Sequence, residues 1–135
     1  MREINTSFVK SEDELKDFIY LTPYNSKDGS YDINDHMVEL NDTIRYIDDE
    51  LKMLSKASDL MTWYDITFND EEFKEKIKNL VDKKNELFIY RVNVKNLLSK
   101  KQEKCNHEED NLRYTGHDHN YNYYECELCG KEIKD

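Results

Sequence analysis

The chain has 135 residues, a mass of 16.3 kDa and a formal charge of −10, from 30 acidic and 20 basic side chains. Apolar residues make up 37%, below the roughly 45–50% of an ordinary globular domain, which predicts a thin or elongated core. Three glycines and one proline are too few for the turns of an all-β sandwich or barrel, so helix is expected. No apolar run approaches the roughly 18 residues of a membrane span, and no apolar signal segment follows Met1. We therefore expect a soluble, cytoplasmic protein.

The charge is distributed unevenly along the chain. Residues 1–69 carry a net −8, residues 70–104 carry +3 and residues 105–135 carry −5. An acidic surface repels nucleic acid phosphates, which disfavours direct nucleic acid binding. The same acidity favours a basic partner, although acidic residues also serve simply to solvate exposed helix faces.

A short helix over about residues 12–20 is predicted near the N-terminus. Ser11 is a suitable N-cap and Glu14 follows three residues later, which is a capping-box pattern. Leu15, Phe18 and Ile19 share one face of this helix, and Pro23 limits its extension.

A long helix over residues 33–61 is predicted by a regular apolar stripe. The spacing alternates between four and three residues, which is the period of two helices packed with a left-handed crossing. Such a stripe requires a partner helix. Its members are Ile33, Met37, Leu40, Ile44, Ile47, Leu51, Leu54, Ser58 and Met61.

The partner helix is predicted over residues 70–104. Asn69 and Glu72 form a second capping box, and Phe68 is placed to pack on Phe73 as a hydrophobic staple. The fold class is therefore mainly α, with an antiparallel, coiled-coil-like helical hairpin in a domain of residues 1–104. Pairing within one chain and pairing between two chains bury similar stripes, so a homodimer stays open. The stripe of this helix consists of Phe73, Ile77, Leu80, Val81, Leu87, Phe88, Val94, Leu97 and Leu98.

The connection between the two long helices is rich in large apolar side chains. Trp63, Tyr64 and Ile66 either fold back onto the N-terminal helix or form an exposed patch. An exposed aromatic patch is typical of a protein-binding site.

The C-terminal segment, residues 105–135, contains the pattern expected of a small zinc ribbon. Cys126 and Cys129 form a Cys-x-x-Cys knuckle followed by glycine, and Cys105 and His107 can supply the other two ligands. The alternating residues 121–125 predict a strand that leads into Cys126. A segment this small cannot bury a sufficient core, so a bound Zn²⁺ is expected to hold it together.

The fourth ligand and the role of the metal have alternatives. His117 and His119 are alternates to His107 as the fourth ligand. Four ligands with three sulfurs favour a closed, structural site over a catalytic one, which keeps an open water position. The sequence contains no phosphate-binding glycine loop and no nucleophile motif, so we expect no enzymatic activity.

The segment also resembles known zinc-ribbon tails. The matching pieces are Cys105-Asn106-His107, Tyr114 to Asp118, Tyr123-Tyr124 and Cys126 to Gly130. They are similar to the tails of small uncharacterised proteins from Gram-positive bacteria and their phages. The resemblance covers about a fifth of the chain and implies a metal site without an activity.

Two functions follow as expectations. The first is a non-enzymatic protein–protein interaction or regulatory protein that uses the hairpin and the ribbon. The second is an acidic mimic of nucleic acid that inhibits a nuclease or another basic nucleic-acid-binding enzyme, for which small acidic phage inhibitors are an analogy in size and charge. Direct nucleic acid binding through Lys100, Lys101 and Lys104 is less favoured, because the ribbon is acidic. The candidate mimic residues are Glu39, Asp42, Asp48, Asp49 and Glu50.

Overall fold

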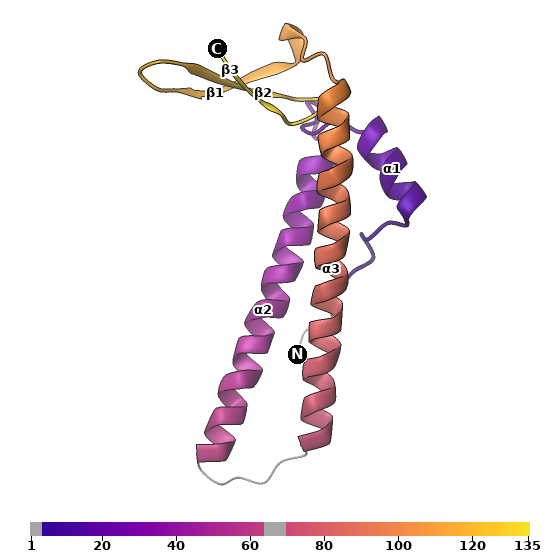
Figure 1. The fold of residues 1–135 in the computed structure, drawn as a ribbon, viewed down its shortest axis with the longest axis vertical. Coiled ribbons are helices and arrows are strands. Elements are labelled where there is room, and N and C mark those ends of the chain that lie inside the picture. The colour runs from indigo at the N-terminus through magenta and orange to yellow at the C-terminus, as the bar shows by residue number, and fades with distance from the viewer. Residues whose placement is uncertain (1–3, 64–69) are drawn as a thin grey trace.

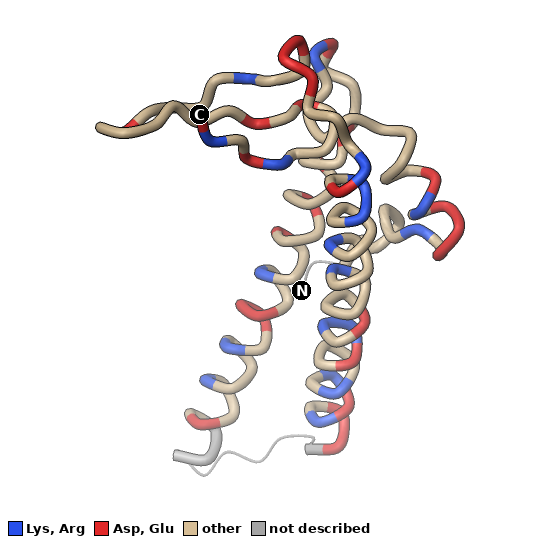
Figure 2. Tube along the Cα trace, turned by 45° about the horizontal axis from the view of Figure 1, so that its top comes forward, with Lys and Arg blue, Asp and Glu red and all other residues tan. Residues whose placement is uncertain are grey.

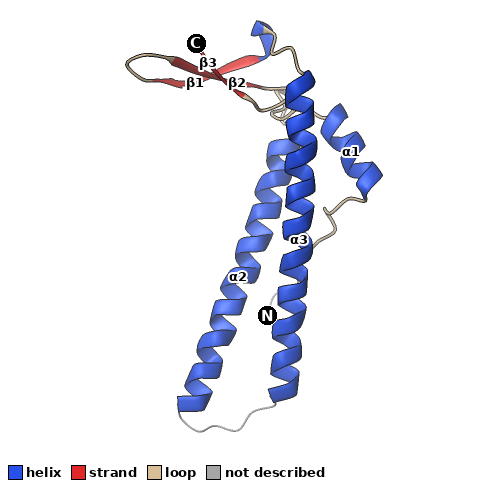
Figure 3. Cartoon of the chain, viewed as in Figure 1, coloured by secondary structure: helices blue, strands red, loops and turns tan. Residues whose placement is uncertain are grey.

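The computed structural model describes residues 4–63 and 70–135, with side-chain environments for residues 4–60 and 71–135. A short helix is followed by two long antiparallel helices, and a small sheet lies across the end of the long helices (Figure 1, Figure 3). The predicted fold class is confirmed. The elements are α1 (Glu12–Leu21), α2 (Ile33–Trp63), α3 (Asp70–Lys104), the 3₁₀ turn η1 (Glu109–Asn111), β1 (Leu112–His117), β2 (Asn122–Cys126) and β3 (Glu132–Lys134).

Side-chain caps fix the starts of the first two helices. Ser11 accepts a hydrogen bond from the backbone N–H of Glu14, as the capping box predicted. Asp32 caps α2 by accepting from the N–H of Asp35, and the carboxylate of Asp35 accepts from the N–H of Asp32 in return. This reciprocal pair satisfies two donors at the helix start. The predicted cap of α3 at Asn69 and the staple at Phe68 lie outside the described residues.

The core occupies the half of the hairpin nearest the sheet. In α2 the predicted stripe is buried from Ile33 to Ile47 except at the half-buried Met37, and in α3 the buried side chains run from Leu80 to Val94. Of two neighbouring residues predicted in this stripe, Leu80 is buried and Val81 is exposed, because the seam passes through Leu80. Tyr90 and His36 belong to the core although their side chains are polar.

Helix α1 packs against the C-terminal half of α3 (Figure 1). Leu15 and Ile19 enter the main core, and the ammonium of Lys101 on α3 donates to the carbonyl oxygens of Ile19 and Thr22, at 2.9 and 2.5 Å. These bonds satisfy carbonyls that the end of α1 leaves free. The described packing surface of α1 is therefore α3, and the predicted contact of α1 with residues 64 and 66 lies outside the described residues.

The sheet is antiparallel with the order β1-β2-β3. The predicted strand before Cys126 is confirmed as β2, the central strand, whereas β1 and β3 were not predicted. A bulge between Tyr114 and Gly116 shifts the register of β1 against β2. None of the described helices combines the length and the apolar character needed to cross a membrane.

Candidate metal centre

Four side chains converge where the sheet meets the end of α3. They are Cys105, His107, Cys126 and Cys129, and their ligand atoms all lie within 4.8 Å of one another. The sulfurs of Cys105 and Cys126 are 3.7 Å apart, too far for a disulfide bond, and Nδ1 of His107 lies 3.4 Å from the sulfur of Cys129. Such a cluster of three sulfurs and one imidazole could hold a metal ion.

Local backbone geometry brings the four ligands together. Cys105 directly follows α3, and Cys126 ends β2 before a turn that returns at Gly130, where φ is +77°. A Cβ atom at Gly130 would lie 2.5 Å from the ring of Tyr24, so only glycine fits this turn beside that ring. His107 also has a positive φ of 52°, an uncommon conformation for a residue with a side chain, and it turns the chain back toward the cysteines.

The surroundings of the two buried cysteines shift their thiol pKa values in opposite directions. Cys126 and Cys129 are buried, and burial alone raises the pKa of a thiol. Burial opposes ionisation of Cys126, but hydrogen bonds from His107 and from the backbone N–H groups of Leu128 and Cys129 lower its pKa to about 7. Burial and the neighbouring thiols of Cys126 and Cys105 together raise the pKa of Cys129 to about 12. A cation would stabilise all three thiolates together, because it removes their mutual repulsion.

The cluster is anchored to the helical region from two sides. On one side, the amide of Gln102 in α3 donates to the carbonyl of Cys129 at 3.0 Å. On the other side, the N–H groups of Tyr24 and Asn25 donate to the carbonyls of Leu128 and Glu127, at 3.1 and 2.8 Å. The connection between α1 and α2 thus pairs with the Cys-x-x-Cys turn.

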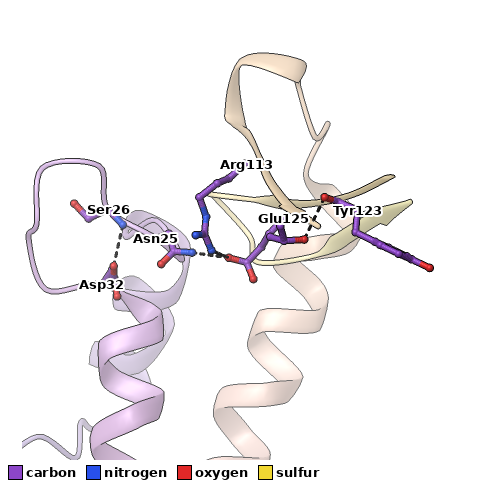
Figure 4. Close-up of polar contacts among 7 residues, drawn as sticks. Asn25, Ser26, Asp32, Arg113, Tyr123 and Glu125 are labelled. Carbon is purple, nitrogen blue, oxygen red and sulfur yellow. Dashed lines mark hydrogen bonds and ion pairs between the residues drawn. The ribbon is translucent and has the colours of Figure 1, made fainter. Parts of the chain in front are cut away.

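Charged side chains extend this anchor. Figure 4 shows the side chains of Asn25 and Arg113 meeting the carboxylate of Glu125, at 2.5 and 3.1 Å. Lys27 forms an ion pair with Glu127 at 3.2 Å, and the backbone of Ser26 donates to Asp32 at the start of α2. The sheet is therefore held against the α1–α2 connection as well as against α3.

The two alternate histidines lie away from the cluster. His117 is exposed at the end of β1, where its Nδ1 is 2.5 Å from the hydroxyl of Tyr114. His119 is exposed in the turn that follows. Asp118 organises that turn by accepting hydrogen bonds from the backbone of Asn120 and Tyr121. The structure thus brings together Cys105 and His107 with the knuckle, and leaves both alternates outside.

The residues predicted to contact a partner have mixed environments. Three of the five acidic candidates already have partners: the carboxylate of Glu39 accepts from Tyr31, Asp42 pairs with Arg45, and Asp48 pairs with Lys84. Asp49 is exposed and Glu50 is half-buried. Tyr64, Ile66 and the side chain of Trp63 lie outside the described residues, so their role stays a prediction.

Sequence reasoning missed the residues that surround the cluster. Lys101 was considered only as a less favoured nucleic acid contact, yet its ammonium donates to carbonyls at the end of α1, and the charge of the three cysteines acts on it. Tyr24 and Gln102 carried no sequence signal, because their contacts join segments far apart in the chain. The chain matches no protein-family model, and comparisons with curated proteins and with solved structures give no significant match.

Proposed function

We propose that the cluster is a structural Zn²⁺ site. Soft thiolate ligands select Zn²⁺ over the hard cations Mg²⁺ and Ca²⁺. A tetrahedral ion with bonds of about 2.3 Å to sulfur separates two sulfur ligands by about 3.8 Å, close to the 3.7 Å between Cys105 and Cys126. Four protein ligands complete the tetrahedron and leave no position for a reacting water molecule.

Lys101 supports this assignment through charge. A Zn²⁺ ion with three thiolates and one neutral imidazole carries a net charge of −1. Burial lowers the pKa of Lys101, and the negative charge of the three cysteines acts in the opposite direction. The positive charge of the partly buried Lys101 and the net negative charge of the proposed zinc site would therefore stabilise each other.

Metal content tests the assignment. The purified chain should contain one Zn²⁺ per molecule by elemental analysis, and Co²⁺ substitution should give the visible absorption of a tetrahedral thiolate complex. The His107→Ala variant should lose most of this absorption, whereas the His117→Ala variant should retain it. Full binding by His107→Ala together with loss in His117→Ala would reject the ligand set.

We further propose that the chain is a non-enzymatic interaction protein, which binds a protein partner on the distal half of the α2–α3 hairpin, the half away from the metal site. This half consists of residues 51–60 of α2 and 71–79 of α3. No side chain described in these two ranges is fully buried, and Leu51, Leu54, Phe73 and Ile77 are only half-buried. The predicted seam therefore continues in sequence beyond the point where the two helices bury it.

A second stripe carries the proposal. Met53, Ala57 and Leu60 repeat at steps of four and three on α2, and Met53 and Leu60 are 64% and 57% exposed. The half-buried seam residues Leu51 and Leu54 and this exposed stripe together give α2 a broad apolar face, on which another helix or protein surface can pack. A second copy of this chain is one such partner.

The experiment compares two double variants. Met53→Glu with Leu60→Glu places charge on the distal stripe, while Val38→Glu with Val92→Glu places the same charge on exposed apolar residues nearer the sheet. Light scattering measures self-association, and affinity capture from the native host measures partner binding. The Met53→Glu, Leu60→Glu variant should lose whichever of these the wild type shows, whereas the Val38→Glu, Val92→Glu variant should retain it. A chain that stays monomeric and captures no protein, or equal loss in both pairs, would reject the proposal.

The nucleic acid mimic remains the alternative. Because Asp42 and Asp48 are already paired with Arg45 and Lys84, fewer carboxylates are free to imitate phosphates. The interaction protein is for this reason the preferred function.

A further inference from the structure

A groove lies between α1 and α3 on the side of the molecule away from α2. It has a volume of about 850 Å³, within the range of about 300–1,000 Å³ typical of small-molecule sites. Its floor is formed by Leu15, Tyr90 and Leu97, of which the first two are buried. The other lining residues are polar or aromatic and form two walls.

Four lysines line the groove in a chain whose net charge is −10. Lys10 and Lys16 come from the α1 side, and Lys100 and Lys104 come from the last turns of α3. Glu12 is the acidic residue among the lining side chains, so the groove carries a local +3. Figure 2 shows basic positions continuing along α3 to its end.

These lysines have no anionic partner among the described residues. None of the four takes part in an ion pair there, whereas five other basic side chains in the described part of the chain do: Lys27, Arg45, Lys83, Lys84 and Arg113. Lys10 and Lys104 instead place their ammonium groups 5.0 and 6.0 Å from the ring centres of Phe18 and Tyr20. The dipole of α3 accounts for basic residues at its end, but it does not account for Lys10 and Lys16 on the opposite wall.

The remaining lining groups suit a flat, polar ligand. Tyr20 is half-buried and offers an aromatic ring beside Lys104. Asn93 and Asn96 are exposed on the wall formed by α3, and each amide offers both a donor and an acceptor. Ammonium groups bind phosphates, and aromatic rings and amides bind heterocyclic bases.

We propose that this groove binds a nucleotide that carries two or more phosphate groups. The lysines hold the phosphates from both walls, and Tyr20 stacks on the base while Asn93 and Asn96 hydrogen-bond to its edge. This site is separate from the metal cluster and from the distal half of the hairpin. Two of its lysines, Lys100 and Lys104, belong to residues 70–104, the segment with a net charge of +3 in an otherwise acidic chain.

The test is isothermal titration of the metal-loaded full chain with ATP. We expect saturable binding to one site that weakens as salt is raised, because the phosphate contacts are electrostatic. The Lys16→Ala, Lys100→Ala double variant removes one exposed lysine from each wall and should weaken ATP binding at least tenfold. Lys76→Ala with Lys78→Ala removes the same charge from exposed positions of α3 outside the groove, and should change binding less than twofold.

Other ligands separate the parts of the proposal. Inorganic pyrophosphate should bind more weakly than ATP, and Tyr20→Leu should weaken ATP binding while leaving pyrophosphate binding unchanged. The proposal is overturned by absence of ATP binding at millimolar concentration, or by equal loss in the two lysine variants. It is also overturned if pyrophosphate binds as tightly as ATP, or if a single-stranded oligonucleotide binds and ATP does not.

Discussion

Nε2 of His36 lies 2.7 Å from the hydroxyl oxygen of Tyr90, and this hydrogen bond joins α2 to α3 inside the core. On the other side of the ring, Nδ1 lies 2.8 Å from the hydroxyl of Tyr31, which donates to the carboxylate of Glu39 at 2.8 Å. Since Tyr31 donates to Glu39, its oxygen accepts from Nδ1–H. Because burial lowers the pKa of His36 and so favours the neutral imidazole, Nε2 accepts from the hydroxyl of Tyr90, and both ring nitrogens are hydrogen-bonded.

Removing the Tyr90 hydroxyl should destabilise the fold. In Tyr90→Phe, Nε2 of His36 loses its buried donor and the N–H of Lys10 loses its acceptor, which costs about 1–3 kcal/mol of unfolding free energy. Urea unfolding measures this loss. Tyr121→Phe, which removes an exposed hydroxyl, should stay within about 0.5 kcal/mol of the wild type. Equal stability of the two variants would contradict the role of the bond.

The same histidine should make stability depend on pH. Burial lowers the pKa of His36, the nearby ammonium of Lys10 lowers it further, and Glu39 acts in the opposite direction. As the pH falls, the histidine therefore binds a proton more readily in the unfolded chain than in the folded chain. The contribution of His36 to folding stability is fully present above the ordinary histidine pKa of about 6.5, and it decreases as the pH falls below that value. His36→Gln should be less stable at neutral pH and lose less stability between pH 7 and pH 5.5. An identical pH slope in both proteins would contradict this assignment.

Gly130 should be intolerant of a side chain. Gly130→Ala adds a Cβ atom at 2.5 Å from the ring of Tyr24 and also forces alanine to a φ of +77°, which costs about 1–2 kcal/mol by itself. Gly29→Ala is the matched control, because φ is +81° there and no atom lies within 4 Å of the added carbon. Thermal unfolding should show a larger loss for Gly130→Ala. A loss no greater than that of Gly29→Ala would show that the close approach of Tyr24 is unimportant.

Metal removal should loosen the α1–α2 connection as well as the sheet. The amides of Tyr24 and Asn25 donate to carbonyls in the Cys-x-x-Cys turn, so they lose their acceptors if that turn unfolds. Hydrogen exchange of these two amides should accelerate after treatment with a chelator. The amide of Val94, in the middle of the core, should keep its protection. Unchanged exchange at Tyr24 would show that the connection is held without the metal.

The sequence contained enough information for the helices and for the ligand set. The seam from Ile33 to Ile47 was predicted because its period is regular, and the cysteines were predicted because short ligand spacings restrict the geometry of a metal site. The structure then places His107, rather than His117 or His119, beside the three sulfurs.

Other features depended on packing between distant segments. The position of α1 could not be predicted, because residues 22–32 are long enough to reach several surfaces of the hairpin. His36 and Tyr90 were overlooked because their polar side chains do not fit an apolar template, although Leu87, Tyr90, Val94 and Leu97 do follow helical spacing. The strand β1 was missed because its residues are mostly exposed and show little alternation.

The hydrogen bonds of Tyr24 and Asn25 with residues 128 and 127 close a chain segment of more than 100 residues. Contacts between such distant positions form late in folding, because the chain loses conformational entropy when the long loop closes, before the contacts can stabilise it. The hairpin, whose helices follow one another directly, should therefore form first, and docking of the Cys-x-x-Cys turn on the α1–α2 connection should be the last step. In a ribosome-bound chain this docking waits until residue 130 has emerged, so the connection between α1 and α2 stays open throughout most of synthesis.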